Sequence, residues 1–201
     1  ELQTVADKGL IKGYASVFEV FDFHNEKTVK GAFKRSIKED FKGLDVPKIK
    51  VLSQHNWTQP IGLPVALMED TAGLYFEAEI SGNADNLPAK AMRALMSEGL
   101  VDGVSIGYRI RPGGIVELGE KDFDITQLRG PTWLWPCKLT DLLLMEFSPV
   151  TFPSNWEARL EVVKSMGRVQ VPGHRFARLP AAPEPDDQGD NGDTKTDNSD
   201  E

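Results

Sequence analysis

Short strand-like runs separated by turn-forming residues recur along this chain, and they limit the folds it can adopt. Such runs cover residues 10–20, 48–54, 61–68, 73–80, 103–110 and 139–150. The polar stretch at 69–72 joins two of them and predicts a β-hairpin. Short strands in sequence order tend to pair with their neighbours, so the pattern predicts a strongly curved antiparallel sheet or a small β-barrel.

A few short helices are predicted between and after these strands. Phe33, Ile37 and Phe41 recur every fourth residue and predict an amphipathic helix over 31–41. Asp85 or Asn86 is placed to cap a second helix, which Gly99 would end. The Ser154-Asn155-Trp156-Glu157 stretch has the pattern of a capping box and predicts a third helix, ending near Ser165. Together these elements predict the α+β class.

The charge of the chain is concentrated at its end. The formal charge is −8, but eight acidic residues and one lysine follow position 183, which leaves about −1 for the rest. We therefore expect one domain over 1–170 and an acidic, disordered tail over 171–201. A nearly neutral body without a basic run predicts no nucleic-acid partner. The sequence contains no apolar run of membrane-spanning length, so no membrane partner is expected either.

The segment from Gly103 to Tyr108 contains the best candidate for a nucleophile. Val104, Ile106 and Tyr108 alternate with Ser105 and Gly107 at period two, which predicts an apolar face and a second face that carries a small hydroxyl. Glycine within a strand often marks a place where another backbone approaches. A serine that merely fills a strand position is the alternative reading. The lone cysteine, Cys137, has no nearby histidine in sequence and is not expected to be reactive.

A serine nucleophile needs a base, and the chain has three histidines from which to choose. His24 lies in a charged loop and His174 lies near the tail, so both are expected to be solvated. His55 follows the 48–54 strand, where a fixed backbone can hold its imidazole over an opening. We therefore predict that His55 is the partner of Ser105.

The imidazole in turn needs an orienting group. Glu146 is an isolated carboxylate within the most apolar strand, so it either faces outward or has a partner. Asp102 and Asp141, each nearer a turn, remain alternatives. The sequence has no paired histidine or cysteine motif for a metal and no nucleotide-binding fingerprint, so neither a metal nor a cofactor is expected.

Seven short motifs, in order, resemble the prohead protease family of tailed bacteriophages. They extend from about residue 10 to residue 160 and comprise Lys12-Gly13-Tyr14-Ala15, Val29-Lys30-Gly31-Ala32-Phe33, Gln54-His55-Asn56, Ile61-Gly62, Asp70 to Phe76, Gly103 to Tyr108 and Met145 to Asn155. That family is similar in fold to assemblin, the capsid maturation protease of herpesviruses. The resemblance implies an assemblin-like fold with Ser105 as nucleophile and His55 as general base. Glu146 matches the glutamate of the family's Glu-x-Ser motif, which implies the orienting role.

The same resemblance implies a biological role. It indicates a serine endopeptidase that acts inside the viral procapsid, in the host cytoplasm, on scaffold segments, on part of the major capsid protein and on itself. Assemblins act as dimers, so a homo-oligomer is a state to test. Amides in the 109–114 turn are candidate oxyanion donors, and residues 112–136 are a candidate flap. The alternative function is a non-catalytic scaffold or capsid-interaction β-domain, or a β-rich capsid component.

Overall fold

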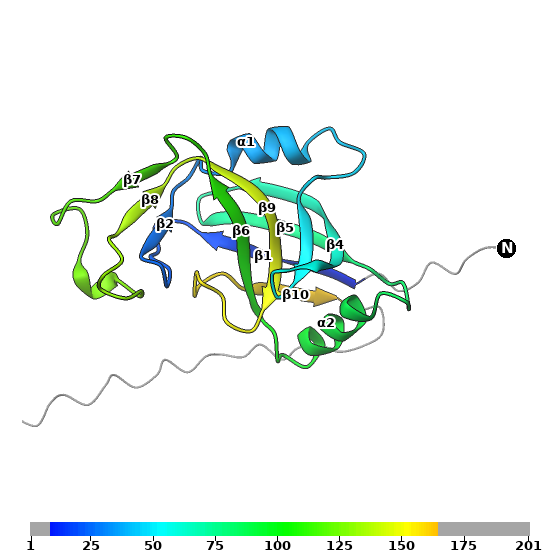
Figure 1. The fold of residues 1–201 in the computed structure, drawn as a ribbon. Coiled ribbons are helices and arrows are strands. Elements are labelled where there is room, and N and C mark those ends of the chain that lie inside the picture. Colours follow the sequence, from blue (N-terminus) through cyan, green and yellow to red (C-terminus); the bar gives the residue numbers. More distant parts are fainter. Residues whose placement is uncertain (1–8, 165–201) are drawn as a thin grey trace, which may run out of the picture. The chain divides into compact units, whose positions relative to one another are not determined.

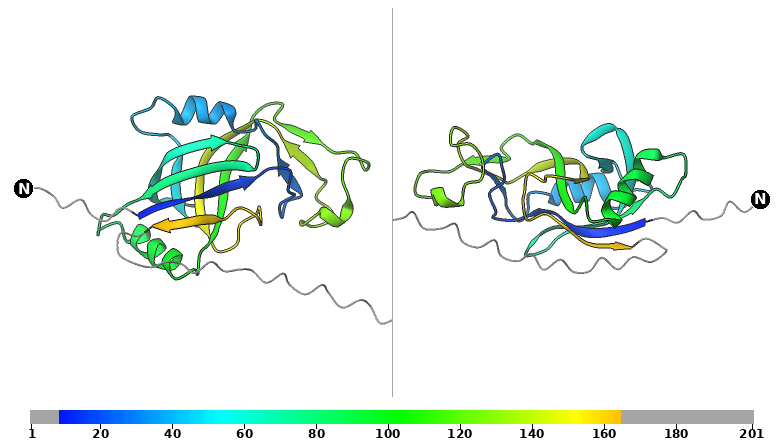
Figure 2. Two further views of the ribbon diagram at one scale, coloured as in Figure 1. Left: turned by 180° about the vertical axis from the view of Figure 1, so that it is seen from behind. Right: turned by 90° about the horizontal axis from the view of Figure 1, so that it is seen from below.

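A seven-stranded curved sheet forms the main body of the structure. The computed structural model describes residues 9–164, so the predicted acidic tail and His174 lie outside the described residues. The strand order in this sheet is β10-β1-β5-β4-β3-β9-β6 (Figures 1 and 2). The strands are β1 (Gly9–Val17), β3 (Lys50–Ser53), β4 (Asn56–Glu69), β5 (Gly73–Ile80), β6 (Gly103–Ile110), β9 (Leu142–Val150) and β10 (Leu160–Lys164).

Within this main sheet, neighbouring strands are antiparallel except at one place, where β3 runs parallel to β9. The predicted hairpin is present, because β4 and β5 pair on either side of the turn at 70–72. A smaller sheet with the order β2-β8-β7 lies beside the main one (Figure 1). It consists of β2 (Glu26–Thr28), β7 (Ile115–Glu117) and β8 (Cys137–Leu139). The predicted α+β class with a curved, mainly antiparallel sheet is therefore confirmed.

Two helical segments accompany the large sheet (Figure 1). The first joins α1 (Lys34–Ser36) to the π-helical turn η1 (Ile37–Phe41). The second is α2 (Leu87–Ser97), which begins at Asn86, whose side chain accepts a hydrogen bond from the amide of Ala89. Gly99 follows its end with φ +73°, as a left-handed residue after a helix does. A 3-10 turn, η2 (Ile125–Gln127), lies in the segment between β7 and β8.

The predicted third helix is wrong, since the chain after Asn155 forms the edge strand β10 instead. The side chains of the expected capping box have other partners. Ser154 donates to the Asp22 carboxylate, and the Asn155 amide donates to the carbonyl of Val17. The strand that follows pairs with β1, which would otherwise have an open edge. The pairing of β10 with β1 therefore outweighs the local sequence preference for a helix.

The core lies between the inner face of the sheet and the helices. Its largest fully buried side chains include Phe33, Phe76, Phe147, Ile11 and Ile49. The Phe76 and Phe147 rings pack with their centroids 4.6 Å apart. Burying such side chains stabilises the fold by roughly 1.5–3 kcal/mol each. No helix among the described residues is long and apolar enough to cross a membrane.

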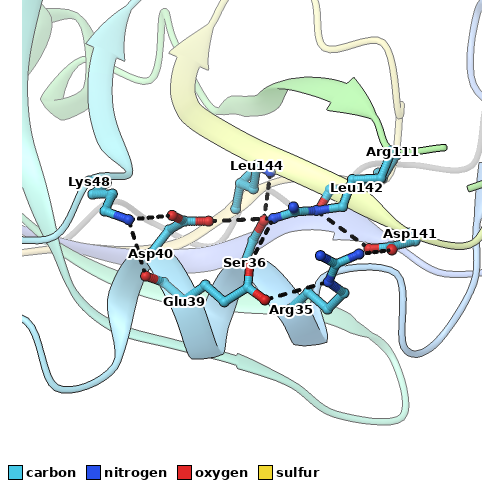
Figure 3. A network of polar contacts seen from close by, with 9 residues as sticks. All are labelled: Arg35, Ser36, Glu39, Asp40, Lys48, Arg111, Asp141, Leu142 and Leu144. Atoms are coloured by element: carbon cyan, nitrogen blue, oxygen red, sulfur yellow. Dashed lines mark hydrogen bonds and ion pairs between the residues drawn. The ribbon is translucent and has the colours of Figure 1, made fainter.

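A polar network attaches α1 and η1 to β9 (Figure 3). The buried hydroxyl of Ser36 donates to the carbonyl of Leu142 and accepts from the amide of Leu144, at 2.9 Å each. Asp141, just before β9, pairs with Arg35 at 2.9 Å. These contacts fix the start of the strand that carries Glu146.

Candidate active site

His55 lies in a two-residue turn between β3 and β4. Ser53 pairs with Asn56, and the two residues between them have φ angles of 52° (Gln54) and 59° (His55). Positive φ at both central positions is typical of a type I′ turn, which is costly for residues other than glycine, asparagine and aspartate. The predicted strand therefore ends at Ser53, and His55 occupies a strained backbone position of the kind that clusters at functional sites.

Contacts with β9 and the segment after it hold this turn in place. The amide of Gln54 donates to the carbonyl of Pro149 at 3.3 Å. The Gln54 side chain donates to Thr151 Oγ1 at 3.0 Å and accepts from the Thr151 amide at 3.2 Å. The His55 amide donates to Ser148 Oγ at 3.2 Å. Four hydrogen bonds thus compensate for the strain and fix the backbone from which the imidazole projects.

Glu146 is the partner of that imidazole. Its side chain is 4% exposed, and its Oε1 lies 2.6 Å from His55 Nδ1. Because a carboxylate only accepts hydrogen bonds, Nδ1 is the nitrogen that carries the proton, and Nε2 is left free to accept another. The expectation that a carboxylate on this apolar strand has a partner therefore agrees with its contacts.

Ser148 and Gly107 shape the position of the carboxylate, and sequence reasoning missed both roles. Ser148, fully buried, donates to Glu146 Oε2 at 2.6 Å. Gly107 is opposite Glu146 in the β6–β9 register, and a Cβ built there would collide with Glu146 Oε1. Gly107 thus makes room for a side chain of its own sheet, whereas the sequence suggested the approach of another backbone. Period two alone places Glu146 and Ser148 on one face, which is the signal that could have identified Ser148.

Ser105 lies opposite Ser148 in the same register, so the two side chains are on the same face of the sheet. Ser105 is 6% exposed, and no hydrogen bond of its hydroxyl is recorded within residues 9–164. Ser105 and His55 both line a cavity of about 390 Å³. The structure therefore brings a largely buried serine and the imidazole to one opening, and a carboxylate contacts the imidazole from the other side.

The alternation predicted for β6 is interrupted. A register shift between Gly107 and Tyr108 pairs Tyr108 with Leu144, so Tyr108 joins the face of Ser105, contrary to expectation. Ile110, predicted to be on the apolar face, is exposed. The bulge brings the Tyr108 hydroxyl to Glu26, on β2, at 2.5 Å.

The alternative carboxylates have other partners. Asp102 forms an ion pair with Arg159 at 2.9 Å. Asp141 contacts Arg35 and Arg111 in the network of Figure 3. Both of these carboxylates thus pair with arginine side chains, whereas Glu146 contacts His55.

The 109–114 turn is a poor source of oxyanion donors. The Arg111 amide donates to the carbonyl of Asp141, and the Gly114 amide donates to the carbonyl of Arg111. Six residues of extended chain also separate Arg111 from Ser105, a span of roughly 20 Å at 3.3 Å per residue.

Asp22, His24 and Glu26 form a second polar cluster, whose ligand atoms lie within 4.8 Å of one another and could hold a metal ion. His24 is exposed as expected, but it lines the same cavity as Ser105. Cys137 is buried, and burial, followed by the charges of Glu26 and Asp22, raises the pKa of its thiol to about 11. At neutral pH this cysteine is a thiol and not a nucleophilic thiolate.

A comparison with known protein families decides between the possible identities. The family model of caudovirus prohead serine proteases matches residues 1–170. The chain belongs to this family. The prohead protease of Enterobacteria phage HK97 is 28% identical to it over 171 residues, a match that covers 82% of this chain and 64% of the relative. The chain thus spans less than two-thirds of that relative's length. The family expected from the seven motifs is confirmed by the match to the family model.

Two solved herpesvirus structures are also similar to this prohead protease family member. The varicella-zoster virus protease is 14% identical, with a TM-score of 0.33, and the match covers 66% of this chain and 58% of that one. The KSHV protease, solved with a hexapeptide phosphonate inhibitor, is 9% identical with a TM-score of 0.37, and the match covers 71% and 59% of the two chains.

Proposed function

We propose that this protein is a serine endopeptidase that cleaves scaffold or capsid-protein segments, and itself, inside the viral procapsid assembled in the host cytoplasm. The observation that carries the proposal is the contact of 2.6 Å between His55 Nδ1 and Glu146 Oε1, at a cavity that Ser105 also lines. Membership of the prohead serine protease family supports the same assignment.

The proposed mechanism is acyl transfer. The Ser105 oxygen attacks the carbonyl carbon of the scissile peptide, while His55 Nε2 takes the hydroxyl proton. The imidazolium then returns that proton to the leaving amine as the C–N bond breaks. Water, deprotonated by the same imidazole, hydrolyses the acyl-enzyme and restores the Ser105 hydroxyl. Glu146 accepts the hydrogen bond from the Nδ1–H group throughout and stabilises the imidazolium. Ser148 orients Glu146.

The test compares four proteins by intact mass and by cleavage of a capsid-derived peptide: wild type, Ser105→Ala, His55→Ala and Ser97→Ala. Ser97 is partly exposed on α2, and the one hydrogen bond recorded for its hydroxyl among the described residues goes to the carbonyl of Ala94, so its variant is the matched control. We expect the first two variants to lose at least about 10³-fold in kcat/KM, and the control to retain wild-type activity. Peptidase activity that survives Ser105→Ala would refute the nucleophile. An inert but folded wild-type protein would favour the alternative of a non-catalytic scaffold or capsid-interaction domain.

A further inference from the structure

The cavity beside Ser105 has a strongly acidic wall. Asp22 and Glu26 both line it, and none of its described lining residues is a lysine or an arginine. With His24 and His55 neutral, the cavity carries a formal charge of about −2. The nearest lysine in sequence, Lys27, pairs instead with Glu19 at 3.2 Å and lies over the Phe21 ring.

The partners of these carboxylates are neutral donors apart from His24. Glu26 Oε2 accepts from the Tyr108 hydroxyl. Asp22 Oδ1 accepts from the amides of His24 and Glu26, at 2.8 and 2.9 Å, and its Oδ2 accepts from Ser154 at 2.8 Å. These contacts fix the carboxylates without cancelling their charge. Burial, followed by the hydrogen bond to Glu26 and the charges of Glu26 and Asp22, holds the pKa of Tyr108 far above its usual value.

The remaining walls are mainly apolar. Ala15, Ile106 and Leu139 line the cavity, and Phe152, which is 79% exposed, lines it as well. Lysine and arginine combine an aliphatic stem with a cationic head, so they match a cavity that has both apolar walls and carboxylates. A metal ion matches less well, because it needs no apolar walls and because Asp22 already accepts three hydrogen bonds.

An independent observation indicates that a ligand enters here. Ser105 is more than nine-tenths buried as a residue and lines this cavity, and its hydroxyl has no recorded partner within the described part of the chain. Polar groups so deeply buried are normally satisfied, so an unpaired one at a cavity indicates a group that arrives from outside.

We propose that this cavity is a subsite for a lysine or arginine side chain of the substrate, within two residues of the scissile bond, and that Glu26 and Asp22 select it. The inference rests on the proposed peptidase function and adds its substrate class.

The first experiment uses a mixture of peptides derived from a whole proteome, digested with the wild-type protein and sequenced by mass spectrometry. We expect basic residues to be enriched at one fixed position near the cleaved bonds. Peptides built on the best sequence then carry arginine or its neutral isostere citrulline at that position, and lysine or norleucine in a second pair. Arginine should exceed citrulline by at least about tenfold in kcat/KM, because its guanidinium would pair with the carboxylates of Glu26 and Asp22.

Variants test which residues determine the preference for a basic side chain. Glu26→Gln keeps an acceptor for Tyr108 and should reduce the ratio of arginine to citrulline at least about fivefold. Glu26→Lys should reverse the preference towards a glutamate peptide. Glu19→Gln is the matched control, because Glu19 pairs with Lys27 and does not line the cavity; it should leave the ratio unchanged. Thermal unfolding verifies that each variant is folded.

The outcomes separate this inference from the proposed function. Cleavage by the wild type with no basic preference, or a ratio that Glu26→Gln and Glu26→Lys leave unchanged, overturns the subsite and leaves the peptidase intact. Cleavage that persists in Ser105→Ala overturns the proposed function. Calorimetric binding of Zn²⁺ or Mn²⁺ to Ser105→Ala that Glu26→Gln abolishes, without a basic preference, would assign the cluster to a metal.

Discussion

At the scale of single residues, the candidate site depends on the absence of a side chain at position 107. Glu146 fits beside His55 because Gly107, directly across the β6–β9 ladder, has no side chain. Ser148 then fixes the rotation of the carboxylate through Oε2. A carboxylate held on both oxygens can keep its partner in one orientation, which is the requirement for proton transfer by the imidazole.

Gly107→Ala tests this arrangement. The new methyl group must displace the Glu146 carboxylate, so we expect kcat to fall about 100-fold with KM little changed, and the free energy of unfolding to fall by about 1–3 kcal/mol. Kinetics with a cleaved peptide and urea unfolding measure both. Gly119→Ala is the control, because a Cβ there meets only the flexible Asp122 carboxylate. A Gly107→Ala enzyme with wild-type kcat would show that the carboxylate position is unimportant.

At the scale of elements, pairs of side chains tie strands to turns. The hydroxyl of Tyr14, on β1, donates a hydrogen bond of 2.7 Å to Oδ2 of Asp70, which lies in the turn between β4 and β5. That hydrogen bond is the main cause of two opposite shifts. The pKa of Asp70 is lowered, helped by the amides of Gly73 and Ala72, and the pKa of Tyr14 is raised to about 12. The hydrogen bond is therefore weakened at acid pH, when Asp70 becomes protonated, and at alkaline pH, when Tyr14 loses its proton.

Tyr14→Phe should reveal both effects. A lowered carboxyl pKa contributes stability that is present above the unfolded value of 3.8 and is lost as the pH falls through the folded value. A raised tyrosine pKa contributes stability that is present below 10 and is lost as the pH rises through about 12. The difference in Tm between wild type and Tyr14→Phe should thus be largest between these limits and shrink outside them. It should correspond to under about 1 kcal/mol, because the pair is largely solvated. A difference that is constant with pH would contradict this.

At the scale of the whole molecule, segments far apart in sequence build one cavity. Residues 22–28 supply the acidic wall, β6 supplies Ser105, and the β3–β4 turn supplies His55. Asn25, fully buried with φ 57°, connects the acidic segment to the long excursion between β7 and β8. Its side chain accepts from the Gly130 amide at 2.6 Å and donates to the carbonyls of Pro131 and Leu134, at 3.0 and 2.9 Å.

This anchoring bears on the flap proposed for residues 112–136. Asn25→Ala removes three hydrogen bonds and leaves a non-glycine residue in the left-handed region, so the excursion should open more easily by about 3 kcal/mol. Trypsin cleavage after Arg129 should then accelerate about 100-fold, since cleavage follows the open population. Asn25→Gly, which relieves the backbone strain, separates the two contributions. An unchanged rate would mean that Asn25 does not hold the segment.

Much of this molecule follows from sequence, for physical reasons that particular residues illustrate. The runs of strand-forming residues predicted six strands of the main sheet, and the polar turn at 69–72 predicted the hairpin, because both are local consequences of backbone geometry. His55, Ser105 and Glu146 were selected by chemistry, since a serine nucleophile needs a base and the base needs an orienting carboxylate, and the family resemblance indicated the same three residues.

What the sequence determined by itself is thus six strands of the main sheet and the candidate side chains for acyl transfer. The tertiary structure alone decided three further matters: that residues 160–164 complete β1 rather than form a helix, that a bulge turns Tyr108 towards Glu26, and that Gly107 leaves space for Glu146. Each depends on pairing between residues distant in the chain. A strand's alternation specifies two faces, whereas its register and the partners on each face are set by the sheet around it.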